Sequence, residues 1–213
     1  MSLFARRKFL IGAGVGVAVA GAAGYFLLRP NPAPIGFNVS PGELEQARTF
    51  LAGHVSIDAH AHPGRTFLRG AQNVSGKLWL GTLLGSSEDA AVRDMRAGGL
   101  TAAAFAAVSD VQTLGEQGEG LAAVREFEPG EAWTSYKRQI ANLNALSANG
   151  LVYPVRTTDD FAAAQAAGKP GAFLTVEGGD CLEGKPERVA ELFADGVRSI
   201  TLVHYRNNEL GDI

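Results

Sequence analysis

Cysteine is almost absent from this chain of 213 residues. Cys181 is the only one, so the chain can form no internal disulfide and no zinc site made of cysteine thiolates. This scarcity is compatible with any cellular compartment. Histidine is also scarce, and two of the four histidines fall close together: the set is His54, His60, His62 and His204.

Strong charge of either sign is missing as well. The formal net charge is −3, and 46% of the residues are hydrophobic against 19% charged, which is typical of a globular protein rather than a disordered one. No basic patch follows the N-terminus, so nucleic acid is not expected as a partner. No glycine-rich phosphate loop follows the first predicted strand, which argues against an open nucleotide-binding sheet.

The N-terminal residues 1–29 differ in kind from the rest. Arg6-Arg7-Lys8-Phe9-Leu10 resembles a twin-arginine export signal, and an uncharged run rich in glycine, alanine and valine follows to Leu28. About 20 such residues suffice to cross a bilayer. We therefore expect export by the twin-arginine machinery, to the periplasm or to the outer face of the cytoplasmic membrane. Both cleavage and membrane anchoring fit the sequence. Residues 30–40 form a proline-rich linker.

Two histidines one residue apart follow a short apolar strand that begins at Val55. In an extended segment, residues i and i+2 point to the same side, so His60 and His62 can present both imidazoles to one metal ion. Asp58 lies one step back on that side, where its carboxylate could be a further ligand or orient one. The alternative is a polar strand end with two ordinary histidines.

Strands and helices alternate through residues 41–213. Apolar strands are predicted near 55–57, 100–108, 151–155, 172–176 and 197–203; helices are predicted near 40–53, 87–97, 131–148, 157–167 and 186–194. Long loops are predicted at 64–86 and 109–129. This alternation predicts an α/β fold with parallel strands. We expect a metal-dependent-hydrolase (β/α)8 TIM-type barrel, incomplete here, because about five strand-helix units are present where closure needs eight.

The conspicuous polar residues all stand where a predicted strand ends. Glu177 follows the strand 172–176 and precedes Gly178-Gly179, and His204 follows the strand 197–203. In a barrel, these strand ends meet at one mouth, where the site is built. Glu177 is therefore a candidate metal ligand, and the alternative is a surface glutamate in a turn.

These residues resemble the membrane (renal) dipeptidase family, peptidase family M19, which is similar to the amidohydrolases. The resemblance is carried by Glu177-Gly178-Gly179, by the segment 196–204 (GVRSITLVH) and by Asn208. It implies that His60 and His62 bind a first metal, that Glu177 bridges two zinc ions, and that His204 and Asn208 contact the substrate. His204 would also polarise the scissile carbonyl. His62 stands where the family usually has aspartate, which leaves the identity and number of the metals open.

The resemblance also implies further ligands after residue 213, so we expect the chain to be the N-terminal fragment of a zinc-dependent dipeptidase. Its substrate would be a small dipeptide-like molecule, two zinc ions would bind in the complete protein, and a homodimer is compatible with the sequence. Two alternatives stay open. One is another amidohydrolase-type hydrolase acting on a lactone or cyclic amide, and the other is a non-catalytic, exported, barrel-like protein.

Overall fold

The computed structural model describes residues 37–74, 79 and 88–213. The predicted signal or anchor at 1–29 lies outside the described residues, as do most of the linker and part of the predicted loop 64–86. Within the described ranges, no helix combines the length and the hydropathy that crossing a membrane requires. The strands and all but one of the helices below belong to the compact unit Leu44–Ile213.

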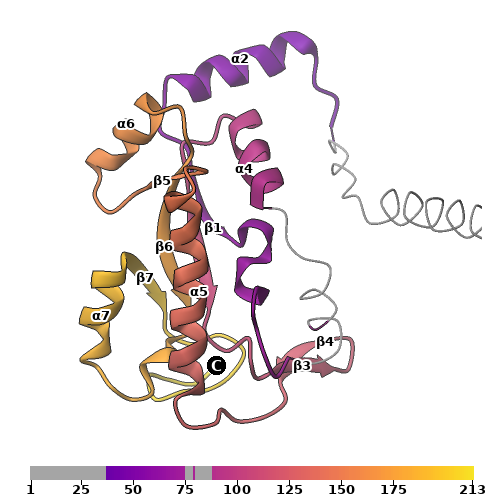
Figure 1. Ribbon diagram of the computed structural model, residues 1–213. Coiled ribbons are helices and arrows are strands. Elements are labelled where there is room, and N and C mark those ends of the chain that lie inside the picture. The colour runs from indigo at the N-terminus through magenta and orange to yellow at the C-terminus, as the bar shows by residue number, and fades with distance from the viewer. Residues whose placement is uncertain (1–36, 75–78, 80–87) are drawn as a thin grey trace, which may run out of the picture. The chain divides into compact units, whose positions relative to one another are not determined.

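The predicted alternation of strands and helices is confirmed (Figure 1). The helical segments are α2 (Pro41–Ala52), η1 (Pro63–Leu68), α4 (Glu88–Ala97), α5 (Glu131–Ala148), α6 (Asp159–Ala166), η2 (Gly179–Leu182) and α7 (Arg188–Asp195). The strands are β1 (Ile57–Ala61), β2 (Ala102–Val108), β3 (Leu114–Gln117), β4 (Gly120–Ala123), β5 (Tyr153–Pro154), β6 (Gly171–Glu177) and β7 (Val197–Thr201).

A five-stranded, wholly parallel sheet is the centre of the fold, in the order β1-β2-β6-β5, with β7 also paired to β6. Strand β2 follows one edge of β6 without a shift in register, from Ala102 opposite Gly171 to Val108 opposite Glu177. The other edge is therefore shared, with β5 at the beginning of β6 and β7 at its end. Among the described strands none joins β1 to β7, so this part of the sheet is open.

The position of β5 differs from what a barrel predicts. In a barrel, each strand lies beside the next one along the chain, so β5 would lie between β2 and β6. Strand β2 pairs directly with β6, and β5 is a two-residue strand at the outer edge. Pro154 gives a physical reason, because proline has no N–H to donate to a second neighbouring strand and is confined to sheet edges.

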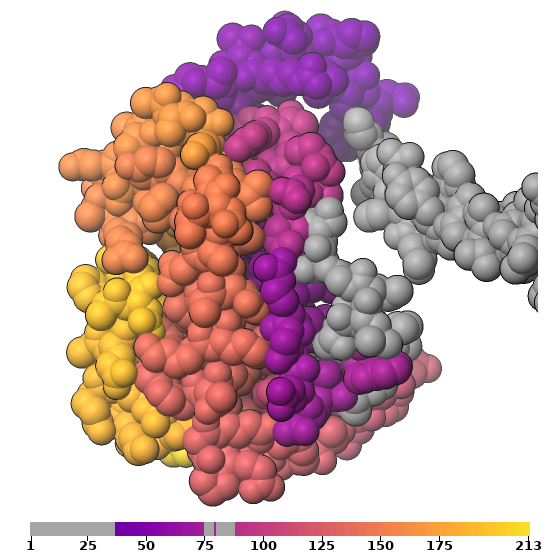
Figure 2. Space-filling model, viewed as in Figure 1, coloured from indigo at the N-terminus to yellow at the C-terminus, as the bar shows by residue number. Residues whose placement is uncertain are grey.

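Helix α5 packs on the face of the sheet and supplies much of the core (Figure 1). Every residue of β2 is buried, as its continuous apolar run predicts. One side of α5 packs against it, since Tyr136, Ile140, Leu143 and Leu146 are buried in the cluster that includes β2 and β6. In the space-filling view, α5 separates the yellow C-terminal segment from the violet segment of η1 (Figure 2).

The predicted loop 109–129 contains a structure that the sequence analysis missed. Strands β3 and β4 form an antiparallel hairpin whose turn includes Gly118, at φ 60°. Its strands are short and poor in β-branched residues, so their composition gave little signal.

Candidate metal centre

The histidine pair lies at the carboxyl end of β1. The strand extends further than predicted and includes His60, while His62 lies between the strand and η1. Pairing with β2 is irregular between Asp58 and Ala61. Such bulges turn side chains at the ends of strands. The two imidazoles reach one point next to this irregular part of the strand.

Three side chains converge there, as the sequence predicted. His60 Nε2 and His62 Nε2 are 3.1 Å apart. Glu177 Oε1 lies 3.3 Å from His60 Nε2, and Glu177 Oε2 lies 3.3 Å from His62 Nε2. With metal–ligand bonds of about 2.0–2.1 Å, two ligands of a tetrahedral ion are about 3.3–3.4 Å apart. Two imidazole nitrogens and a carboxylate at this spacing therefore fit one face of a zinc-like coordination shell.

The backbone supports both histidines. His62 Nδ1 lies 3.3 Å from the carbonyl oxygen of Ala106 in β2. A proton on Nδ1 is donated to that oxygen, which leaves the Nε2 lone pair free for a metal. Asp58 contacts the backbone of His60 and not its imidazole. Its Oδ1 accepts a hydrogen bond of 3.0 Å from the backbone N–H of His60. Asp58 thus stabilises the backbone that carries one ligand.

Glu177 ends β6 and also meets His204, whose Nε2 is 3.1 Å from Glu177 Oε1. The chain turns sharply after the carboxylate. Gly178 has φ 86°, and a Cβ on Gly179 would lie 2.3 Å from Leu210 Cδ1. Gly178 therefore adopts a backbone conformation that favours glycine, and Gly179 lies close to the loop after β7, where a Cβ would be 3.1 Å from the carbonyl oxygen of Leu202.

The charges at this point stabilise one another. Burial alone would raise the pKa of Glu177, but hydrogen bonds and charge attraction from His204 and His62 outweigh it and hold that pKa well below its usual range. Burial would likewise lower the pKa of His204, but hydrogen bonds to Asp110 and Glu177 raise it to about 9. The site is thus an ionised carboxylate surrounded by imidazoles, which suits it to bind a cation.

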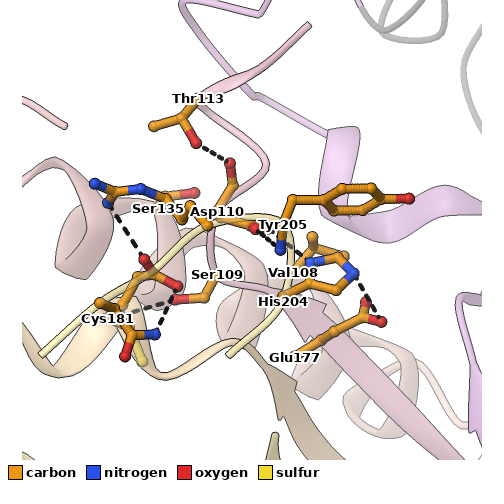
Figure 3. Close-up of polar contacts among 12 residues, drawn as sticks. Val108, Ser109, Asp110, Thr113, Ser135, Glu177, Cys181, His204 and Tyr205 are labelled. Carbon is orange, nitrogen blue, oxygen red and sulfur yellow. Dashed lines mark hydrogen bonds and ion pairs between the residues drawn. The ribbon is translucent and has the colours of Figure 1, made fainter. Parts of the chain in front are cut away.

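Asp110 is a site residue that the sequence analysis missed. It follows β2, and its carboxylate contacts His204 on the side opposite Glu177 (Figure 3). The signal was available, because Ser109-Asp110 follows an apolar strand just as Glu177 does.

Asn208 lies in the loop after β7 and makes contacts within it. Its Nδ2 donates to the carbonyl oxygen of Leu202 at 2.8 Å, and its Oδ1 accepts from the N–H of Leu210 at 2.9 Å. These bonds shape the loop that carries His204. Substrate binding by Asn208 stays a prediction.

The fold and this cluster define a class, the α/β proteins that build a metal centre at the carboxyl edge of a parallel sheet. Within that class the chain belongs to the membrane dipeptidase family, peptidase family M19, whose family model matches residues 44–213. Comparison with curated protein sequences gives no match.

Three solved structures are similar to this chain. A probable dipeptidase, PvdM from Pseudomonas aeruginosa, has a TM-score of 0.56 at 17% identity, covering 81% of this chain and 40% of its own. An amidohydrolase from Pseudomonas aeruginosa has a TM-score of 0.49 at 21% identity, covering 78% and 39%. A metallopeptidase of family M19, dipeptidase AC, has 0.46 at 14% identity, covering 70% and 44%. This chain thus spans 39–44% of the length of these proteins.

Proposed function

We propose that this chain contributes the first strands and part of the metal centre of an exported zinc-dependent dipeptidase. The observation that carries the proposal is the convergence of His60 Nε2, His62 Nε2 and both oxygens of Glu177 at 3.1–3.3 Å. Membership of the membrane dipeptidase family supports the substrate class. In the whole protein, the parallel sheet would be part of a closed (β/α)8 barrel with a second zinc ion.

Each side chain has a part in hydrolysis. His60 and His62 would hold one ion through neutral nitrogens. Glu177, whose two oxygens lie 3.3 Å from His60 Nε2 and His62 Nε2, would hold the same ion and, as the family resemblance implies, a second one. Zinc supplies a Lewis acid and lowers the pKa of water at the site towards about 7. His204 lies beside Glu177, where an Nε2–H can donate to the carbonyl oxygen of a dipeptide as negative charge develops on it.

Export is part of the same proposal. The twin-arginine-like residues 6–10 support delivery to the periplasm or to the outer face of the cytoplasmic membrane, either after cleavage or with the signal as an anchor. Blocking the twin-arginine pathway should leave the protein in the cytoplasm.

The function is tested with the protein expressed from its complete reading frame. We expect it to hydrolyse dipeptides, and expect a chelator and Glu177→Ala each to abolish this activity. Glu187→Ala removes an exposed carboxylate at the start of α7 and serves as the matched control. A panel with lactones and cyclic amides decides the substrate class: turnover of those alone would replace dipeptidase by another amidohydrolase. Dipeptide hydrolysis that survives both the chelator and Glu177→Ala would sink the proposal.

A further inference from the structure

Asp110 is a fully buried carboxylate outside the His60, His62 and Glu177 cluster; its side chain is 0% exposed. A buried charge is costly unless hydrogen bonds compensate for it. Asp110 has two such bonds, both from the loop after β7. His204 Nδ1–H donates to Oδ1 at 2.9 Å, and the backbone N–H of Tyr205 donates to Oδ2 at 2.9 Å (Figure 3).

The backbone of Asp110 is itself firmly held. Its carbonyl oxygen accepts hydrogen bonds from the N–H of Thr113 at 2.9 Å and from Thr113 Oγ1 at 2.8 Å. Val108, two residues earlier, is bonded through both its N–H and its carbonyl to the buried amide of Gln139 in α5, at 2.7 and 2.8 Å. The backbone from which the carboxylate projects is therefore held by the core.

The two contacts of Asp110 determine where the imidazole of His204 points. One oxygen fixes the backbone next to His204, and the other fixes one ring nitrogen. With these two points held, rotation about the side-chain bonds is stopped and Nε2 is left facing Glu177 at 3.1 Å. In serine hydrolases, a buried carboxylate likewise accepts a hydrogen bond from histidine Nδ1–H and so orients the ring with Nε2 towards the reacting group.

We propose that Asp110 is the positioning residue of His204, holding the ring so that Nε2 is presented to the substrate carbonyl beside the metal centre. This rests on the proposed function in one respect only, the role of His204 in hydrolysis. The alternative is that Asp110 merely fastens the loop after β7.

A second buried carboxylate separates these two roles. Asp180 is 1% exposed and contacts the same loop, through Arg206 Nη1 at 3.3 Å and Asn208 Nδ2 at 3.4 Å. These contacts fasten the loop at Arg206 and Asn208 rather than at His204. Asp180→Asn is therefore the matched control for Asp110→Asn.

The variant Asp110→Asn keeps the shape of the side chain but has only one acceptor oxygen for two donors, His204 Nδ1–H and the backbone N–H of Tyr205. The backbone N–H of Tyr205 cannot turn away, so the amide NH₂ must face His204 Nδ1. The first readout is NMR of ¹⁵N-histidine-labelled, metal-free protein. We expect a hydrogen-bonded Nδ1–H of His204 in the wild type and in Asp180→Asn, and its loss in Asp110→Asn. Urea unfolding verifies that each variant is folded.

The second readout is the kinetics of the metal-loaded enzyme from the complete reading frame. We expect Asp110→Asn to lower kcat about 100-fold with KM changed less than about threefold, and Asp180→Asn to change kcat less than about threefold. An unchanged Nδ1–H signal in folded Asp110→Asn overturns the positioning role. Equal losses of kcat in the two variants also overturn it, in favour of loop fastening. If no dipeptide is turned over while the Nδ1–H signal depends on Asp110, the proposed function fails and the positioning of His204 stands.

Discussion

The two ends of the parallel sheet are built from different kinds of polar group. At the carboxyl end, the groups are ionisable and meet one another: His60, His62, Glu177 and His204. At the amino end, Ser56 and Thr101 carry neutral hydroxyl groups that bind the backbone. Thr101 Oγ1 accepts from the N–H of Ser56 at 3.0 Å, and Ser56 Oγ donates to the carbonyl oxygen of Gly99 at 3.0 Å.

This difference separates function from stability. The hydroxyl groups of Ser56 and Thr101 satisfy backbone groups just before β1 and β2, and they introduce no charge there. The carboxyl end instead gathers groups whose charges depend on one another, and His60 remains 50% exposed there. Groups of this kind are retained for binding rather than for packing. Variants at the carboxyl end should therefore change zinc affinity, and variants at the amino end should change the free energy of unfolding.

The largest effect is expected at the carboxyl end. His60→Ala removes one of three converging ligands. Removing a residue that only hydrogen-bonds to a metal ligand already weakens metal binding by about 10–100-fold. We therefore expect zinc affinity to fall by at least about 100-fold when the ligand itself is removed. The metal-free protein should keep its free energy of unfolding within about 0.5 kcal/mol, because the side chain is half exposed. Zinc titration and urea unfolding in chelator measure the two quantities.

His54→Ala is the control for this variant. His54 is exposed, stacks on Phe50 and lies before β1, outside the converging ligands. Zinc affinity should not change in this variant. An equal loss of affinity in the two variants would contradict the metal centre described above.

The opposite result is expected at the amino end. A Cβ on Gly171 would lie 2.7 Å from Val155 Cγ2 and 3.0 Å from Ala102 Cβ, so Gly171→Val forces β5 and β2 away from β6. We expect the free energy of unfolding to fall by about 3 kcal/mol, with zinc affinity of the folded protein unchanged. The midpoint of urea unfolding measures this loss.

Gly120→Val is its control, because Gly120 is also in a strand and a Cβ there meets no atom within 4 Å. Its free energy of unfolding should change by less than about 0.5 kcal/mol. Similar stability losses in both variants would mean that valine itself, rather than the contact at Gly171, is responsible.

The same contrast explains what could be predicted from the sequence. The convergence of His60, His62, Glu177 and His204 was predictable, because apolar runs mark the strands and parallel strands end at one edge. The family resemblance predicted the same cluster. In each case the informative residues are close in sequence to the strand end that they mark.

What could not be predicted depends on contacts between distant segments. The direct pairing of β2 with β6 follows from the close approach of Gly171 to Ala102 and from Pro154, whose missing N–H keeps β5 at the edge. In sequence, Asp110 is marked only as a polar residue after a strand, which does not identify its partner. Only the return of the chain 94 residues later gives it His204 as a partner.

The smallest effect concerns an ion pair away from the metal centre. Glu131 begins α5 and bonds to both terminal nitrogens of Arg125, at 2.6 and 2.8 Å. The hydrogen bond to Arg125 lowers the pKa of Glu131 more than burial raises it. A lowered folded pKa contributes stability above the unfolded value of about 4.3, and this stability is lost as the pH falls through the folded pKa.

Glu131→Gln should therefore lower the free energy of unfolding by about 1 kcal/mol at pH 7, and the difference from wild type should close as the pH falls from about 4.3 towards 3. Urea unfolding at pH 7, 5 and 3 measures it, with Glu187→Gln on α7 as the exposed control. A difference that stays constant down to pH 3 would show that Glu131 stabilises through packing and not through charge. In that case the fold outside the metal centre would owe its stability to packing alone at this position. The contrast with the charged carboxyl end of the sheet would then be sharper.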